Sequence, residues 1–340
     1  MRAYPAGTGD SEVERPTAAT GFSGAEVFRV RLENRLYCLR CWPAAGLTPD
    51  RIRGLHRLLQ TVSRQGGPPV AVPLVNRDGE TLTASGQHWW QLEPWLPGQA
   101  DYHQRPSPQR LSAAMQALAQ WHQAASHFHP RPNEEQWFGS HPAAPSPAVL
   151  ERIERLGEYS MSAQSLLRRA LVKRPTQPTP EQAEFCELGM RGLTAAHRLI
   201  PRVHQELQSL RQTLFRLQPC LRDVWHDHVL FQGETVSGLI DASACRHDHV
   251  ATDIARLVSS LIAEDRHGWD AALTAYQTQR TLDLDEQVLV WALDRSGTLL
   301  SCLSWISRFV HEQLPPGWLP AVSTRVAAMI ARLETWSAEC

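Results

Sequence analysis

Hydrophobic and polar residues alternate along two short segments in the first part of the chain. Residues 26–32 and 35–42 largely follow a period of two, and Glu33-Asn34 separate them. Alternation of this kind places apolar side chains on one face of a strand. The pattern therefore predicts a strand, a short turn and a second strand.

The period then lengthens to that of a helix of about 16 residues. Thr48-Pro49-Asp50 combines an N-cap residue, a proline at the first helical position and an acid in the first turn. The apolar residues at helical spacing are Ile52, Leu55, Leu58, Leu59 and Val62. The sequence therefore predicts a helix that begins after Thr48.

Three short apolar stretches follow, at 70–75, 80–84 and 89–95. Gly66-Gly67 ends the helix before them, and residues 76–79 supply a turn. Short stretches bounded by turn residues are typical of strands. We therefore expect a small sheet with one helix in the first hundred residues.

From Ser107 onward the apolar spacing is helical. Helices are predicted from 107, over 149–172 and from 181 to about 215, with proline-rich loops at 130–147 and 174–180. One hairpin, 229–231 with 236–240, interrupts them, and helices resume at about 253. The predicted class is α+β: a small antiparallel sheet with one helix, followed by a larger, mainly helical part that contains a β-hairpin.

Charge and hydropathy exclude several classes of protein. Lys plus Arg number 34 and Asp plus Glu number 35, so no net positive field favours nucleic acid or an acidic membrane. No window reaches the roughly 18 apolar residues of a membrane span, and no signal peptide is visible. We therefore expect a soluble, cytoplasmic protein without nucleic-acid or membrane partners. Lys173 is its one lysine.

The seven cysteines are odd in number and irregularly spaced. This usage is typical of reduced thiols. Cys38 and Cys41 form a CxxC, but no second pair exists and residues three apart in a strand face opposite sides. We interpret them as strand thiols.

Acid, base and metal-ligand types gather between residues 221 and 241. Folding the predicted hairpin brings His228 near Asp241, and Asp223 lies in the loop just before. A carboxylate that orients an attacking hydroxyl, beside a metal that neutralises phosphate charge, is the arrangement that phosphoryl transfer needs. We therefore predict Asp223 as the base and His228 with Asp241 as metal ligands.

Motifs in this region resemble a known family. Residues 221–228 (LRDVWHDH) resemble the kinase catalytic loop H-R-D-x-x-x-x-N. Residues 238–242 (GLIDA) and 253–257 (DIARL) are similar to the metal-binding strand and the following helix of aminoglycoside phosphotransferases and choline kinase-like proteins. The resemblance implies a protein-kinase-like fold with two lobes and the use of ATP with Mg²⁺ or Mn²⁺.

Asp253 begins the helix that contains the DIARL motif. A carboxylate at such a position caps backbone N–H groups, so we interpret Asp253 as structural.

The first part of the chain resembles the same family more weakly. Residues 20–30 resemble its phosphate-covering turn, residues 37–40 its Y-x-L-[KR] strand and residues 91–98 its hinge. The implied domains are a polar leader (1–19), a nucleotide-binding lobe (20–98) and a helical lobe (99–340). The residues that the resemblance assigns to nucleotide binding are Gly21, Ser23, Gly24, Arg40, Glu93 and Trp95.

This chain also departs from the family pattern. Leu221 replaces the loop histidine, His228 replaces the metal-binding Asn, and Arg40 aligns with the strand lysine. An imidazole suits Mn²⁺ or Zn²⁺ better than Mg²⁺. The helix over 49–64 has no Glu to pair with Arg40, and Glu26 is one candidate for that role.

Three classes of function stay open. The leading hypothesis is a kinase that transfers the γ-phosphoryl group of ATP to a hydroxyl of a small molecule. The first alternative is a kinase-like pseudoenzyme that binds a nucleotide or partner and transfers nothing. The second is a structural zinc protein that uses the two His-Asp-His triplets, 226–228 and 247–249.

The identity of the acceptor also stays open. An aminoglycoside needs an acidic wall, a choline-like cation needs an aromatic box, and an amino alcohol or homoserine fits equally well. Candidate acidic residues are Asp283, Asp285 and Glu286, and candidate aromatic residues are Trp291, Trp305 and Trp318.

Overall fold

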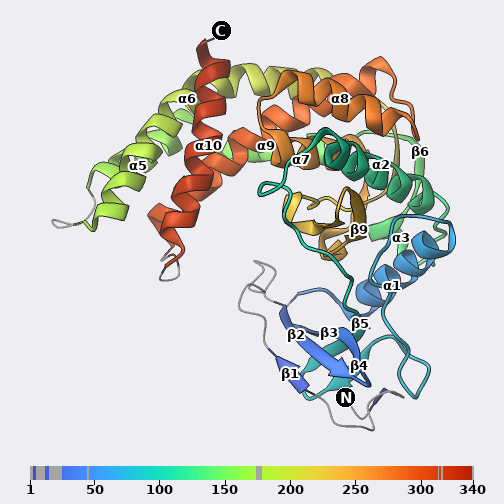
Figure 1. Ribbon diagram of the computed structural model, residues 1–340. Coiled ribbons are helices and arrows are strands. Elements are labelled where there is room, and N and C mark those ends of the chain that lie inside the picture. The colour runs from blue at the N-terminus through green and yellow to red at the C-terminus, as the bar shows by residue number, and fades with distance from the viewer. Residues whose placement is uncertain are drawn as a thin grey trace. The chain divides into compact units, whose positions relative to one another are not determined.

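The computed structural model describes residues 3–4, 12–14, 25–43, 46–173, 178–312, 314 and 317–338. Its residue contacts form two compact units, each made of two stretches of chain (Figure 1). The first unit is Met1–Pro142 with Arg216–Leu282, and the second is Ala143–Phe215 with Asp283–Cys340. The domain boundary expected between residues 98 and 99 lies inside the first unit and stays a prediction.

The first unit begins with a five-stranded antiparallel sheet of order β1-β2-β3-β5-β4. The predicted strands 26–32 and 35–42 are confirmed as β2 and β3, and the stretch at 89–95 forms β5. The bounds are β1 (Glu12–Glu14), β2 (Glu26–Leu32), β3 (Arg35–Trp42), β4 (Thr83–Ser85) and β5 (His88–Pro94).

The stretch 70–75 is not a strand of this sheet. Outside the named strands, Val70 makes an isolated bridge to Leu239, and the Leu74 N–H donates to the Leu92 carbonyl at 2.7 Å. Pro69 and Pro73 lack the N–H groups that a ladder requires. The prediction from apolar character alone is therefore wrong here.

Helix α1 (Pro49–Arg64) covers one face of the sheet. It begins as predicted, with the Thr48 hydroxyl accepting a hydrogen bond from the Arg51 N–H at 3.4 Å. Ile52 is fully buried and clusters with Trp42 and Leu82. Because side chains alternate along β3, the face that carries Trp42 also carries Arg40 and Cys38. The helix therefore packs on the face that holds the predicted phosphate-binding arginine.

The remainder of the first unit combines helices with two small sheets. The predicted hairpin is confirmed as β8 and β9, and β7 lies in a second sheet of order β10-β7-β6. The helices are α2 (Pro108–Ala125), α3 (Glu135–Phe138), α7 (Ala251–Ile262) and α8 (Arg266–Gln277), with 3₁₀ turns η1 (His226–His228) and η2 (Ala242–Ala244). The strands are β6 (His141–Ala144), β7 (Phe215–Cys220), β8 (Val229–Gln232), β9 (Thr235–Leu239) and β10 (Arg246–Asp248).

Gly98 lies where the chain leaves the first sheet and passes the hairpin. Its φ of +104° favours glycine, and a Cβ there would lie 2.2 Å from the Ser237 hydroxyl. The next residue, Gln99, exchanges backbone hydrogen bonds with Phe231 at 2.9 and 3.1 Å. Glycine therefore permits the close approach that ties this connection to the hairpin.

The second unit is helical. Its helices are α4 (Pro147–Glu158), α5 (Met161–Val172), α6 (Pro180–Leu210), α9 (Leu284–His311) and α10 (Leu319–Ala338). Helix α6 packs against α9 and α10 (Figure 1). Gly192 of α6 allows this packing, because a Cβ there would lie 3.0 Å from Ile306 of α9 and 3.4 Å from Ile330 of α10.

Two helix predictions need correction. The helix expected over 149–172 is two helices, because Tyr159 leaves the helical conformation and the Ser160 side chain caps α5. The helix expected to continue to about 215 ends at Leu210, because Phe215 and Leu217 alternate with polar residues and belong to strand β7. The α+β class is as predicted. Among the described residues, we find no helix with the length and apolar character that a membrane crossing requires.

Candidate active site

The hairpin places His228 and Asp241 next to each other. His228 ends η1 just before β8, and Asp241 follows β9 in a left-handed conformation with φ of 57°. The Ile240 N–H donates to the His228 carbonyl at 3.0 Å, and His228 Nε2 lies 3.9 Å from Asp241 Oδ2. The prediction that folding of the hairpin brings His228 near Asp241 is therefore confirmed.

Both ring nitrogens of His228 have hydrogen-bond partners. The Trp225 indole N–H, which can only donate, points to Nε2 at 2.8 Å. Nδ1 therefore carries the proton and donates to the Asp223 carbonyl at 2.8 Å. Burial lowers the pKa of His228, which favours this neutral form. His228 closes the loop that carries Asp223, and it can bind a metal only when Trp225 releases Nε2.

The Asp223 carboxylate forms an ion pair with Arg256 of α7. Its side chain is 48% exposed, so the second oxygen can be reached from solvent. A carboxylate in this situation can accept a hydrogen bond from an incoming hydroxyl. The geometry is compatible with the role predicted for Asp223.

Asp253 of α7 binds the backbone of the same loop. Its fully buried carboxylate accepts hydrogen bonds from the backbone N–H groups of Leu221 at 2.7 Å and Arg222 at 2.5 Å. Arg222 has a left-handed φ of 62°, which costs energy for a side chain with a Cβ. Asp253 is structural, as predicted, but it caps the loop before Asp223 and not its own helix.

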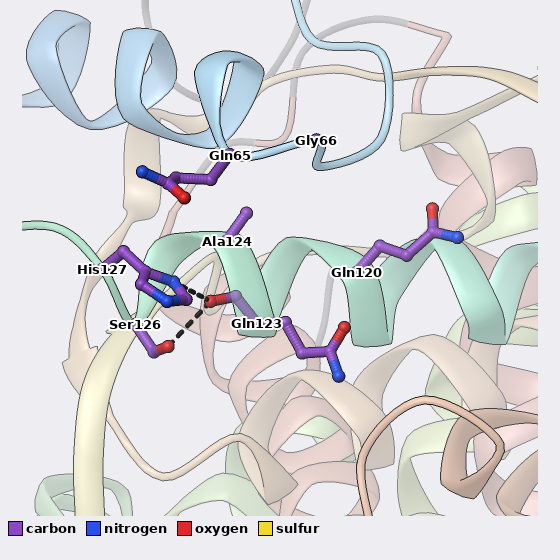
Figure 2. Close-up of a pocket in the computed structure, with 7 residues that line it drawn as sticks. All are labelled: Gln65, Gly66, Gln120, Gln123, Ala124, Ser126 and His127. Atoms are coloured by element: carbon purple, nitrogen blue, oxygen red, sulfur yellow. Dashed lines mark hydrogen bonds between the residues drawn. The ribbon is translucent and has the colours of Figure 1, made fainter.

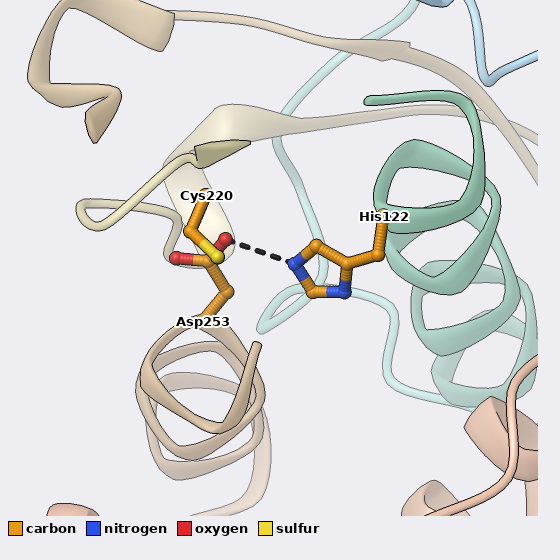
Figure 3. Close-up of side chains that lie close together, drawn as sticks. All are labelled: His122, Cys220 and Asp253. Carbon is orange, nitrogen blue, oxygen red and sulfur yellow. Dashed lines mark hydrogen bonds and ion pairs between the residues drawn. The ribbon is translucent and has the colours of Figure 1, made fainter. Parts of the chain in front are cut away.

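His122 of α2 anchors Asp253 (Figure 3). Its Nε2 lies 3.0 Å from Asp253 Oδ2, and its Nδ1 lies 2.7 Å from the Tyr276 hydroxyl. Cys220 completes a group of three potential metal ligands within 4.8 Å of one another. These residues do not suit a metal, because both nitrogens of His122 and both oxygens of Asp253 are already engaged. Burial also raises the pKa of Cys220 well above its usual range. The group is a hydrogen-bonded support for the loop.

Arg40 links the first sheet to Asp241. Its guanidinium lies 3.4 Å from Asp241 Oδ1 and 3.7 Å from Glu93 Oε1. Burial opposes the charge of Arg40, but the two carboxylates raise its pKa above the ordinary value. Burial likewise opposes the charge of Asp241, but Arg40 and then His228 lower its pKa. Both groups are therefore ionised at neutral pH.

Glu26 is not the partner of Arg40. It lies opposite Cys41 in the β2–β3 register, and Cys41 and Arg40 face opposite sides of the strand. The same alternation places Cys38 and Cys41 on opposite faces as free thiols. The expectation for Glu26 is therefore wrong, and the acid next to Arg40 is Glu93.

The other predicted nucleotide contacts have mixed placements. Gly21, Ser23 and Gly24 lie outside the described residues. The Trp95 backbone N–H donates to the Leu36 carbonyl at 3.1 Å. Its indole lies under the Arg29 guanidinium, 5.5 Å from the ring centre. These assignments stay predictions.

The two His-Asp-His triplets do not form a zinc site among the described residues, where the group of His122 is the one set of three possible ligands. His226 packs edge-on against His103, with ring centres 4.3 Å apart. His249 is buried, and its Nδ1 accepts the Ala251 N–H at 3.1 Å. Asp248 forms an ion pair with Arg222 at 3.1 Å.

A separate hollow of about 300 Å³ lies between the end of α1 and helix α2 (Figure 2). It is lined mainly by uncharged polar side chains and includes no candidate catalytic residue. The lining residues are Gln65, Gly66, Gln120, Gln123, Ala124, Ser126 and His127.

Sequence reasoning missed three contributors to the site. Arg256 belongs to the DIARL motif, so its position was visible although its pairing with Asp223 was not. His122 was visible only as a polar residue in an apolar helix face. Tyr276 offered no signal, because its contact with His122 joins residues 154 positions apart.

Comparison with known families gives a match over most of the chain. A family model described as the phosphotransferase enzyme family matches residues 17–288. A homoserine kinase from Nitrobacter winogradskyi is 33% identical over 102 residues, which is 28% of this chain and 31% of that protein. The match thus spans about a third of the length of this relative.

Solved structures share the fold. The chain is similar to a spectinomycin phosphotransferase complex with ADP and spectinomycin (TM-score 0.67, 11% identity, covering 95% of this chain and 93% of that one). It is also similar to an amicoumacin kinase (0.63, 15%, 92% and 86%) and to a microcompartment-associated aminopropanol kinase (0.62, 13%, 99% and 95%). The predicted protein-kinase-like fold is therefore confirmed.

Proposed function

Since the chain belongs to the phosphotransferase enzyme family, we propose that it is an ATP-dependent kinase that phosphorylates a hydroxyl group of a small molecule. The observation that carries the proposal is the convergence of Asp223, Asp241 and Arg40 at one end of the hairpin. Arg40 lies 3.4 Å from Asp241, and His228 links Asp241 to the Asp223 loop.

Asp223 orients the acceptor hydroxyl and receives its proton. The hydroxyl oxygen forms the new bond to the γ-phosphorus of ATP, the bond to the β,γ-bridging oxygen breaks, and ADP leaves with that electron pair. Arg256 pairs with one oxygen of Asp223, and because the side chain is 48% exposed, the other oxygen would be the one that accepts the hydroxyl. Most of the rate enhancement would come from this positioning and from charge neutralisation.

Asp241 is the principal ligand for a divalent metal, which would supply charge neutralisation on the phosphates. Its ionised carboxylate suits a hard cation such as Mg²⁺ or Mn²⁺. His228 is the second ligand only if it exchanges the Trp225 N–H for the metal, and its imidazole then favours Mn²⁺. Arg40 contacts phosphate oxygens through its planar guanidinium.

A pseudoenzyme is the alternative. Leu221, His228, Arg40 and the absence of a Glu from α1 are four departures around one site. The two acids hardest to replace in phosphoryl transfer, Asp223 and Asp241, are nevertheless present and ionised or reachable. These acids make the active enzyme the better-supported reading.

The test combines nucleotide binding with turnover. We expect ATP with Mg²⁺ or Mn²⁺ to raise the melting temperature of the wild type, and Asp241→Asn to abolish that shift. Asp223→Asn should keep the shift and lose about 10²- to 10⁴-fold of the rate of ADP formation. Acceptors to screen include homoserine, 1-amino-2-propanol and aminoglycosides.

Asp227→Asn is the matched control, because Asp227 is an exposed acid of η1 and lies 3.4 Å from His226. It should behave as the wild type. Nucleotide binding without turnover for any acceptor would support the pseudoenzyme. No stabilisation by any nucleotide or metal would contradict the kinase proposal and leave only a pseudoenzyme that binds a partner.

A further inference from the structure

We propose that Glu93 holds the Arg40 guanidinium in position for the nucleotide phosphates, and that a hydrogen-bonded chain through Gln91 and His56 fixes Glu93 from helix α1. Glu93 would thus supply, from the neighbouring strand β5, the carboxylate partner of Arg40 that α1 does not provide. The inference rests on the proposed function, because it assigns a positioning role at the same site.

Strand register brings the two groups together. In the β3–β5 pair, Arg40 lies opposite Gln91, and Cys38 lies opposite Glu93. Opposite residues share a face, so all four side chains point to the α1 side of the sheet. Glu93 is diagonal to Arg40, and its Oε1 lies 3.7 Å from the guanidinium. The ion pair therefore joins two adjacent strands of the sheet.

The Trp42 indole fixes the orientation of the Gln91 side-chain amide, because its N–H can donate a hydrogen bond but cannot accept one. The Trp42 indole N–H donates to Gln91 Oε1 at 2.7 Å, so the Gln91 amide NH₂ must point the other way. That NH₂ donates to Glu93 Oε2 at 2.5 Å. One oxygen of Glu93 is thereby held by Gln91, and the other faces Arg40.

Helix α1 contributes His56 to this hydrogen-bonded chain of side chains, and His56 is 1% exposed. His56 Nε2 lies 2.8 Å from Gln91 Oε1, and its Nδ1 lies 2.7 Å from the Thr81 hydroxyl. Because Gln91 Oε1 only accepts, His56 carries its proton on Nε2 and donates to it. Side-chain contacts therefore connect helix α1, through His56 and Gln91, to the Glu93 carboxylate that pairs with Arg40.

No other acid competes for this role among the described residues. Glu93 and Asp241 are the carboxylates within ion-pair distance of Arg40 in that part of the chain. The acid of α1, Asp50, is 62% exposed and lies 3.6 Å from Arg53. If Asp241 turns to a metal, Glu93 remains as the partner that keeps Arg40 in place.

The experiment is a double-mutant cycle on the affinity for a non-hydrolysable ATP analogue with Mn²⁺, measured by calorimetry. Glu93→Gln should raise Kd about tenfold, and the same change in an Arg40→Met background should raise it less than about twofold. Glu93→Asp keeps the carboxyl group and should recover part of the affinity. Glu33→Gln, in the exposed turn between β2 and β3, is the matched control and should leave Kd unchanged.

The outcomes separate this inference from the proposed function. If the wild type binds the analogue and Glu93→Gln binds it equally well, the positioning role is overturned while the kinase proposal stands. The same follows if the effect of Glu93→Gln persists undiminished without Arg40. If Glu93→Gln does not fold, Gln91→Met removes the amide that holds Glu93 Oε2, and a Kd for Gln91→Met that equals the wild type overturns the role of the hydrogen-bonded chain. A wild type that binds no nucleotide overturns both.

Discussion

At the scale of single residues, the candidate site contains two carboxylates with different surroundings. Asp241 has a side chain that is 24% exposed, and its pKa lies below the usual range because of Arg40 and His228. Asp223 is 48% exposed and has one cation, Arg256, beside it. A metal ligand must stay ionised, whereas an orienting base must reach its substrate. The two environments suit these separate tasks.

Trp225→Phe tests whether His228 binds metal. Removing the indole N–H frees His228 Nε2, which lies 3.9 Å from Asp241 Oδ2. We expect the affinity for Mn²⁺, measured by paramagnetic resonance titration, to increase about three- to tenfold. Trp137→Phe on α3 is the matched control.

An unchanged or weaker affinity for Mn²⁺ in Trp225→Phe, with the control equal to the wild type, would contradict the metal role of His228. His228 would then serve only to close the loop through the Asp223 carbonyl.

Individual residues were predictable where local geometry decides. Hairpin folding alone places His228 beside Asp241. The partner of Arg40 was not predictable, because Glu93 lies 53 positions away and depends on the β3–β5 register. The sequence suggested Glu26, which lies nearer along the chain but on the other face.

At the scale of elements, helix α1 carries a buried histidine on its packing face. Burial lowers the pKa of His56 to about 4, against the usual 6.5. The folded protein therefore keeps His56 neutral while the unfolded chain protonates it. Between these pH values the unfolded state binds more protons, so the free energy of unfolding falls as pH decreases from about 6.5 to about 4.

His56→Gln should reduce this pH dependence. Between pH 7 and pH 5 the protonation of His56 in the unfolded state should lower the free energy of unfolding of the wild type by about 2 kcal/mol. The His56→Gln variant should not show this part of the decrease. Urea unfolding at the two pH values measures the difference. His127→Gln, an exposed histidine after α2, is the control. Equal losses in the wild type and His56→Gln would disprove the assignment.

Elements were predictable where a strong period and a clear terminal signal coincide. Helix α1 has both, in its apolar spacing and its Thr48 cap. Strand β7 has only a short alternation at Phe215 and Leu217, and it follows α6 after four residues without a clear terminal signal. Its pairing with β10 depends on residues about thirty positions later in the chain.

At the scale of the whole molecule, the candidate residues all belong to the first unit, although the chain leaves that unit after Pro142 and returns at Arg216. The acids considered for an aminoglycoside site belong to the second unit. Asp283 and Glu286 form a capping box at the start of α9, which is a sufficient reason for their presence. The acceptor could not be predicted from the sequence, because its candidate residues also have structural roles in the helices.

Hydrogen exchange with mass spectrometry should show this division. A non-hydrolysable ATP analogue with Mn²⁺ should slow exchange in β3, in residues 221–228 and in residues 240–244. Helices α5 and α10 should exchange as in the free protein. Equal protection in the second unit, or none around residues 221–244, would contradict the placement of the nucleotide site.

Arg40 also determines which reagents can detect this protein. Nucleotide probes that label kinases by acylating a lysine at the phosphate site need an amine nucleophile, and a guanidinium stays protonated. The chain's one lysine, Lys173, is exposed at the end of α5, in the second unit. A probe that must acylate a lysine at the position of Arg40 therefore finds no amine there, and reversible competition or turnover would be the way to detect the protein.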